Sequence, residues 1–225
     1  MITMDDLQGH WRRDWIKAPG FEDHSTAVHW LQAGDLYADI RIPAERPDLG
    51  AYSCLADVPQ DMFAPLLNSE GFAGTIEVSN NRCTWRREIN WQGVPEMDDI
   101  GLMSFTEQGL IEDGVLADYR ELWQAEPTAP LRGHRIAFGE MSGILVENDA
   151  EFLVGLGRPP APASGRRAQF ASTYVLGHWD GADGIATLST NPFCEGQIVL
   201  RRDAGFTWHA PSFDGAPADF RLNAA

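Results

Sequence analysis

Tyr, Asp, Arg and Glu side chains occupy alternate positions in three segments of the chain, 36–42, 83–91 and 116–123. Because successive side chains of a β-strand point to opposite faces, each segment would have two faces of different character. The polar faces carry Tyr37, Asp39, Arg41, Arg86, Glu88, Tyr119 and Glu121. Phenol, carboxylate and guanidinium groups brought together in this way can hold a polar ligand or transfer protons.

Two interpretations of these polar faces stay open. In a half-buried sheet they lie in water, and opposite charges on neighbouring strands form solvated pairs that contribute little stability. In a closed barrel they line the lumen, where every buried charge needs a partner. The mixed signs of these side chains are compatible with such pairing.

The acid–base candidates for an enzyme are Glu88, Glu121 and His178, with His29 as an alternative imidazole. A carboxylate or imidazole becomes an effective general acid or base when a dry pocket tunes its pKa. His178 lies between Gly177 and Trp179, where a structural histidine is the competing interpretation. No nucleophile elbow, phosphate loop or dinucleotide fingerprint accompanies these residues, so the sequence names no reaction.

The chain contains eight tryptophans, and several of them fall on the expected strands. Each indole ring buries a large area, so core filling is the simplest interpretation. The alternative is a pocket wall for a flat or apolar ligand. The predicted ligand-binding residues are therefore Trp30, Tyr37, Asp39, Arg41, Trp85, Arg86, Tyr119 and Trp123.

Metal and cofactor signatures are not found in the sequence. The six histidines form no His-x-His or His-Glu-x-x-His pattern. The three cysteines, Cys54, Cys83 and Cys194, are too far apart for a Cys-x-x-Cys site and too few for a disulfide framework. We therefore expect neither a bound metal nor a cofactor.

Short strand-like runs separated by turn signals predict an all-β protein. The expected strands are Trp11–Ile16, Ala27–Gln32, Leu36–Ile42, Gly74–Val78, Cys83–Trp91, Gly101–Thr106, Gly109–Glu112, Leu116–Trp123, His134–Phe138, Gly143–Glu147, Glu151–Leu156, Gln169–Leu176, Gly184–Ser189, Gly196–Arg202 and Phe206–Trp208. One short helix is expected over 60–68, where apolar residues recur at helical spacing although Pro65 interrupts them. The proline-containing segment 124–130 divides the chain into a lobe over 1–125 and a second over 131–225.

The balance of charge limits the partners. The formal net charge is −16, with 33 acidic residues against 17 basic ones. Such a field repels a nucleic-acid backbone and an anionic membrane surface, so neither is an expected partner. The first residues lack the basic and apolar regions of a signal peptide, and no apolar run is long enough to span a membrane, so the cytoplasm is the expected location. The sequence leaves open whether the chain forms a homo-oligomer.

Gly9-His10-Trp11, ahead of a meander of strands, resembles the G-x-W opening of lipocalin-like (calycin) barrels. The stretches 28–43, 83–90 and 118–123 resemble a small two-lobed lipocalin-like family that includes a fungal casein-kinase-interacting protein. The resemblance implies a barrel over roughly the first 125 residues, with a tryptophan that closes one end. It implies no reaction, and this sequence lacks the later threonine–aspartate and arginine signatures of secreted lipocalins.

The expected fold is an all-β, lipocalin-like antiparallel barrel with a second β-lobe and one short helix. Three functions stay open. The first is binding of a small apolar or aromatic molecule in a tryptophan-lined barrel pocket. The second is a cofactor-independent lyase, isomerase or hydrolase that uses a pocket carboxylate, tyrosine and histidine. The third is a protein-interaction module that presents a sheet edge or an apolar face.

Overall fold

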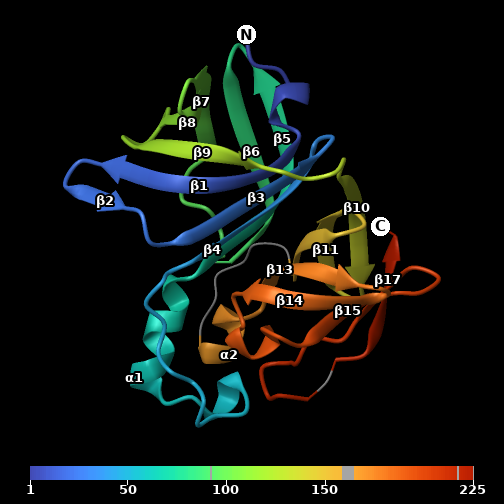
Figure 1. Ribbon diagram of the computed structural model, residues 1–225. Helices are drawn as coiled ribbons and strands as arrows, with labels where there is room; N and C mark the ends of the chain where they lie inside the picture. Colours follow the sequence, from blue (N-terminus) through green and yellow to red (C-terminus); the bar gives the residue numbers. More distant parts are fainter. Residues whose placement is uncertain (92, 159–164, 217, 225) are drawn as a thin grey trace.

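The computed structural model describes residues 1–91, 93–158, 165–216 and 218–224. Figure 1 shows two bodies of antiparallel strands stacked against each other, with the N-terminal half of the chain in one and the C-terminal half in the other. Strands make up most of the ordered structure, so the predicted all-β fold is confirmed.

The first body is a closed barrel, because its consecutive strands pair and the first also pairs with the last. The strands of this barrel are β1 (Gly9–Ala18), β3 (Ala27–Ala33), β4 (Leu36–Ile42), β5 (Glu70–Ser79), β6 (Arg82–Asn90), β7 (Asp99–Thr106), β8 (Gly109–Gly114) and β9 (Arg120–Glu126). The short strand β2 (Phe21–Asp23) pairs with the end of β1 and projects from the barrel (Figure 1).

The second body is also a closed barrel, in which the last strand pairs with the first. It contains β10 (Arg132–Phe138), β11 (Met141–Glu147), β12 (Glu151–Gly157), β13 (Thr173–Asp180), β14 (Asp183–Ser189), β15 (Ile198–Arg202), β16 (Phe206–Trp208) and β17 (Phe220–Ala224). Both β2 and β17 lie outside the set of strands expected from the sequence.

Helical structure is limited to single turns in the described ranges. The predicted helix over 60–68 is present as α1 (Gln60–Phe63) followed by the 3₁₀ turn η3 (Ala64–Asn68), with Pro65 in the first turn of η3. A second turn, α2 (Arg166–Gln169), was not expected and replaces the start of a predicted strand. The other 3₁₀ turns are η1 (Asp5–Leu7), η2 (Leu55–Asp57) and η4 (Pro192–Cys194). None of the helices in the described ranges has the length and hydropathy needed to cross a membrane.

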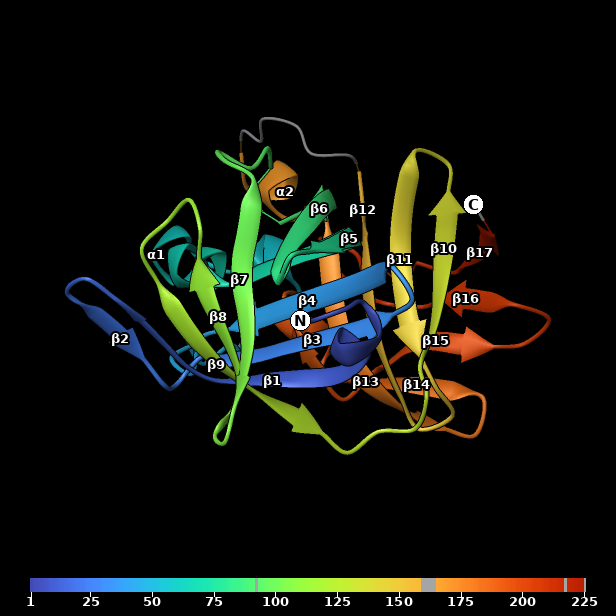
Figure 2. The same cartoon turned by 90° about the horizontal axis from the view of Figure 1, so that it is seen from above.

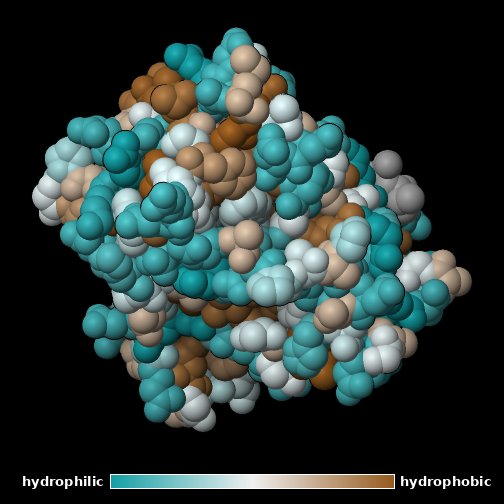
Figure 3. All heavy atoms as spheres, turned by 45° about the horizontal axis from the view of Figure 1, so that its top comes forward, coloured by the Kyte–Doolittle hydropathy of each residue, from teal (hydrophilic) through white to brown (hydrophobic). Residues whose placement is uncertain are grey.

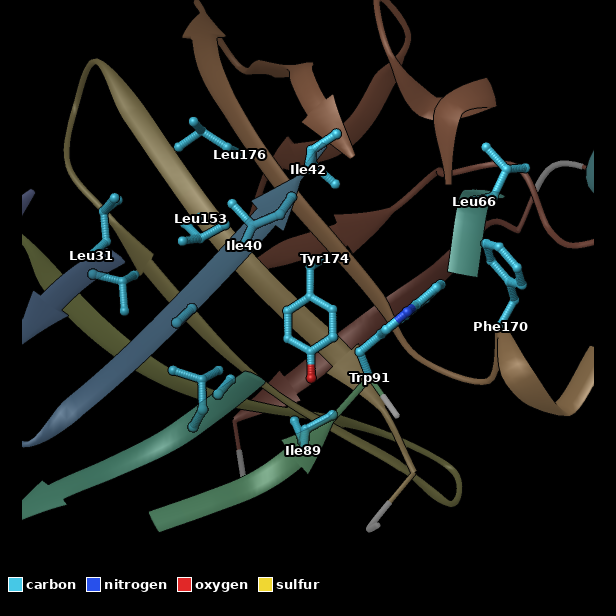
Figure 4. Close-up of a cluster of buried hydrophobic side chains, with 14 of the residues drawn as sticks. Leu31, Ile40, Ile42, Leu66, Ile89, Trp91, Leu153, Phe170, Tyr174 and Leu176 are labelled. Atoms are coloured by element: carbon cyan, nitrogen blue, oxygen red, sulfur yellow. The ribbon is translucent and has the colours of Figure 1, made fainter. Parts of the chain in front are cut away.

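The two barrels share an apolar core. The outer face of β3–β6 packs against the outer face of β11–β13, so that Ile40 of the first barrel lies near Leu153 and Leu176 of the second (Figures 2 and 4). Tyr174 lies at the centre of Figure 4, and its ring packs over Gly71, where a Cβ atom would lie only 2.4 Å from the ring. Glycine at this position therefore permits the close approach of the barrels.

A β-bulge in β6 decides which of its side chains face the lumen. Ala73 of β5 pairs with Ile89, whereas the next residue, Gly74, pairs with Arg87, so Glu88 is the extra residue. The bulge interrupts the alternation of faces. Arg87 precedes the bulge and shares the lumen face with Cys83 and Trp85, whereas Ile89 follows the bulge and therefore joins the core between the barrels.

Candidate functional site

Indole rings fill one half of the first barrel's lumen, which we call the closed half. The ring of Trp30 lies 5.6 Å from that of Trp85 and 5.8 Å from that of Trp123, both edge-on. Trp11 stacks on Trp30, and its Nε1 donates to the carbonyl of Leu7 in η1 at 2.9 Å. All four indoles are buried. The three tryptophans predicted to bind a ligand therefore lie together and pack chiefly on one another.

Charged side chains and one tyrosine occupy the other half of the lumen, which we call the charged half. Its members are Arg13, Asp39, Arg41, Arg87, Asp99, Glu112, Tyr119 and Glu121. The Arg41 guanidinium on β4 approaches Glu121 on β9 to 3.7 Å. Because β4 and β9 are not neighbours in the sheet, this contact crosses the lumen.

Each of the three arginines in the charged half has a carboxylate partner. Arg13 Nη1 lies 2.6 Å from Glu121, and Arg41 Nε lies 3.0 Å from Asp39. Arg87 Nη2 lies 2.6 Å from Asp99, while its guanidinium carbon lies 3.7 Å from the centre of the Phe72 ring. Such pairing is what burial of charge requires.

Burial also raises the pKa of two carboxyl groups in the charged half, Asp39 and Glu112. Desolvation raises the pKa of Asp39 to about 6 although Arg41 acts in the opposite direction. The pKa of Glu112 is raised well above its ordinary value by burial and by the nearby Glu121. Glu112 and Glu121 are cross-strand neighbours, and the charge of Glu121 disfavours ionisation of Glu112.

Glu112 is held by two neighbours and given room by a glycine. The Tyr119 hydroxyl donates to Glu112 Oε1 at 2.7 Å, and Trp123 Nε1 donates to Oε2 at 3.0 Å. A Cβ atom at Gly101 would lie 2.6 Å from Glu112 Cγ. The side chain therefore has one tightly packed position between the two halves of the lumen.

A pocket of about 380 Å³, which we call the mouth pocket, lies at the charged end of the barrel. The loop between β6 and β7 and the loop between β8 and β9 form its walls. The lining residues are Arg87, Asn90, Val94, Pro95, Glu96, Met97, Asp98, Asp99, Ile100, Leu116, Ala117 and Tyr119. Arg87, Asp99 and Tyr119 also belong to the charged half, so the pocket adjoins the polar network of the lumen.

The structure brings together most of the residues predicted from the polar faces. Tyr37, Asp39, Arg41, Tyr119 and Glu121 lie inside the first barrel. Arg86 and Glu88 lie outside it, where Arg86 pairs with Glu77 and Glu88 pairs with Arg135 of the second barrel. Arg87, rather than Arg86, reaches the mouth pocket because it lies on the face of β6 that also carries Cys83 and Trp85 into the lumen.

The predicted acid–base residues Glu88, Glu121 and His178 are not brought together. Glu121 is buried in the lumen, Glu88 is exposed, and His178 is exposed on β13, where its Nδ1 lies 3.3 Å from Thr187 Oγ1. His29 lies elsewhere, with Nδ1 at 2.9 Å from Nε2 of His10, whose Nδ1 lies 2.8 Å from Glu151 of the second barrel. This chain of contacts joins β1 and β3 to β12.

Sequence reasoning missed Arg13, Arg87, Asp99 and Glu112. Arg13 and Arg87 each lie two residues after a tryptophan on an expected strand, Trp11 and Trp85, and this spacing was an available signal. Glu112 is the last residue of the expected strand Gly109–Glu112, a segment whose two faces were not compared. Within the described residues, no group of three or more His, Cys, Asp or Glu side chains is arranged to hold a metal ion.

Comparisons with known proteins bear on the fold. No protein-family model and no curated protein matches the sequence. The structure is similar to that of an uncharacterized protein from Saccharomyces cerevisiae, with a TM-score of 0.51 and 10% sequence identity over 96% of this chain and 85% of the yeast chain. At this identity the likeness concerns the fold alone, and it extends over both barrels.

Proposed function

We propose that the first barrel binds a small organic molecule in the mouth pocket. The observation that carries the proposal is a pocket of about 380 Å³ whose lining combines polar groups of the lumen with apolar side chains of two loops. Small-molecule sites are typically concave, largely apolar and furnished with a few convergent polar groups. Tyr119, Asn90 and Arg87 would supply those polar groups.

A lipocalin-like relationship is part of the same proposal. Three features of the closed half support it: the 3₁₀ turn η1 before β1, a positive φ of 122° at Gly9, and Trp11 bonded back to Leu7. In such a barrel one end is closed by the tryptophan and the ligand approaches from the other. The mouth pocket lies at that other end.

Thermal melting with a panel of metabolites would test the proposal, with intrinsic tryptophan fluorescence as a second signal. A ligand at a hundredfold excess over its Kd stabilises the folded state by about 2.7 kcal/mol. The variant Ala117→Phe adds volume to the pocket lining and should remove this stabilisation. Ala51→Phe, at an exposed position outside the pocket, is the matched control. A ligand that stabilises both variants equally would place binding elsewhere.

Acid–base catalysis in the same pocket is a second candidate function, and Glu112 is the observation that favours it. A buried carboxyl group that keeps its proton can act as a general acid, and Tyr119 connects it to the mouth pocket. For any substrate found by the ligand screen, Glu112→Gln should abolish turnover while leaving ligand-induced stabilisation in place. Full turnover by this variant would exclude the catalytic role of Glu112.

A further inference from the structure

The charges around the mouth pocket are unbalanced. Glu96, Asp98 and Asp99 line it together with a single basic residue, Arg87. Arg87 is already paired with Asp99 and lies over the ring of Phe72. Glu96 and Asp98 are exposed and form no ion pair with any residue that the structure describes. The pocket therefore offers two carboxylates that a ligand can neutralise.

The same pocket has an apolar rim. Val94, Met97 and Leu116 line it, and these side chains are 57%, 55% and 55% exposed. Large apolar side chains that cluster at a concave site are typical of ligand recognition, since covering them removes apolar surface from water. A ligand that fits this rim needs an apolar or aromatic body.

An anionic ligand fits the site poorly. The arginines that could bind it are Arg13, Arg41 and Arg87, and each already has a carboxylate within 3.0 Å. An anion would have to displace one of these partners and leave a buried carboxylate uncompensated, which is costly. The net charge of −16 also opposes the approach of an anion. On the molecular face in Figure 3, hydrophilic residues are interspersed with apolar ones.

A buried hydroxyl near the pocket retains hydrogen-bonding capacity. Tyr37 is fully buried, and the strongest charges acting on it are those of Arg87, Asp99 and Asp39. Its hydroxyl has no hydrogen-bond partner within the described part of the chain. Buried hydroxyl groups are normally hydrogen-bonded, so this one retains unused capacity beside Arg87 and Asp99, two residues that line the mouth pocket, although Tyr37 itself does not line it.

We propose that the mouth pocket selects an organic cation, namely a protonated amine or a quaternary ammonium group on an apolar or aromatic body. The ammonium group would lie against Glu96 and Asp98, and the body would cover Val94, Met97 and Leu116. The inference rests on the proposed binding function and narrows its ligand class. The field of the whole molecule would also speed the approach of a cation, with a rate that falls as salt is added.

Isothermal titration calorimetry of the full chain with three probes of similar shape would separate the effect of ligand charge on affinity from the effect of ligand shape. The probes are phenethylamine as the cation, phenethyl alcohol as the neutral analogue and phenylpropanoate as the anion. We expect the cation to bind roughly tenfold more tightly than the alcohol, and the anion to bind most weakly, because two partly solvated ion pairs are worth about that factor. Equal affinity for all three probes would overturn the cation preference but leave the binding function intact.

Variants that remove acidic side chains show which residues cause the preference for the cation. The double variant Glu96→Gln/Asp98→Asn should lose most of the preference for phenethylamine and keep its affinity for phenethyl alcohol. Asp5→Asn/Asp6→Asn removes the same number of charges at the closed end of the barrel and should change neither affinity by more than about twofold. If the two double variants weaken the cation equally, the preference comes from the overall field and the site is wrong. If none of the probes binds, the proposed binding function and the cation preference both fail for this pocket.

Discussion

At the scale of single residues, the most informative group is the Glu112 carboxyl. It lies next to Glu121 in the lumen, and the two side chains occupy different environments. Glu121 is paired with Arg13 at 2.6 Å, whereas Glu112 is bonded to Tyr119 and Trp123, neither of which is a cation. Two neighbouring carboxyl groups with different environments can divide the roles of acid and base between them.

Glu112→Gln should remove a pH dependence from the stability of the protein. The raised pKa means that the folded state keeps the proton of Glu112 at pH values where the unfolded chain releases it. The wild type therefore loses stability as the pH rises through the folded pKa, and the glutamine variant does not. Urea unfolding between about pH 5 and about pH 9 measures this.

Asp39→Asn is the control for that experiment. Burial raises the pKa of Asp39 to about 6, so this variant should lose only the part of the pH dependence that lies below about pH 6. Parallel stability curves for the wild type and Glu112→Gln would show that Glu112 has the same pKa in the folded and unfolded states.

Residue alternation in the sequence predicted about half of the charged lumen. It found Tyr37, Asp39 and Arg41 because β4 is regular and its alternation is unbroken. It chose Arg86 instead of Arg87 because it placed the more polar face of this strand in the lumen, whereas the face that carries Cys83, Trp85 and Arg87 lies there. Glu96 and Asp98 lie in a loop, where no strand or helix periodicity in the sequence indicates which way a side chain points.

At the scale of elements, β17 shows why the closure of the second barrel was not expected. Its sequence lies in a tail rich in proline, glycine and aspartate, and it follows β16 after a long connection. Its pairing with β10 joins Ile136 to Ala224. A pairing between such distant segments depends on the assembled sheet, so local propensity does not reveal it.

Gly71→Ala should destabilise the protein because the ring of Tyr174 on the second barrel packs directly over this position. The new Cβ atom would lie 2.4 Å from Cγ of Tyr174, in a fully buried position. We expect a loss of about 2 kcal/mol or more in the free energy of unfolding, measured by urea denaturation. Gly205→Ala is the control, since its Cβ would meet only the guanidinium group of Arg221, at an ordinary contact distance of 3.4 Å.

A second test uses the double variant. Replacing Tyr174 by alanine removes the ring, so Gly71→Ala should cost much less in that background. If the cost of Gly71→Ala is the same with and without the ring, the close contact is not its cause.

The contacts from His29 to His10 and from His10 to Glu151, which join β1 and β3 to β12, should make the protein less stable in mild acid. Burial and the neighbouring His10 lower the pKa of His29 to about 4, against 6.5 for a free histidine. Between these values the unfolded chain binds a proton that the folded state does not, so stability falls as the pH drops from 6.5 to about 4. The loss is at most about 3 kcal/mol. The other charges that act on His29 are those of Glu126, Arg12 and Glu151.

His29→Asn isolates this contribution because the amide can replace the bond from Nδ1 to His10. The difference in unfolding free energy between the wild type and this variant should shrink or reverse as the pH falls through the window. Asp39 acts with the opposite sign in part of that window, so the comparison must use the difference between the two proteins. A difference that does not change with pH would show that His29 is not buried as a neutral group.

At the scale of the whole molecule, the barrels share one apolar core. Ile40 on the first barrel and Leu153 on the second are fully buried in the same cluster, together with Tyr174. Separating the barrels would expose this surface to water at a cost that grows with the apolar area. The two barrels should therefore unfold as one cooperative unit, although each closes its own sheet.

Two core substitutions test this cooperativity. Ile40→Ala removes apolar contacts between the barrels, and Leu110→Ala removes them inside the lumen of the first barrel. Each should lower the free energy of unfolding by about 2–5 kcal/mol. Because global unfolding governs the slowest-exchanging amides, each variant should reduce hydrogen-exchange protection equally in β8 and in β12. If Leu110→Ala affected only β8, the first barrel would unfold while the second stayed folded. The mouth pocket could then open without disturbing the rest of the molecule.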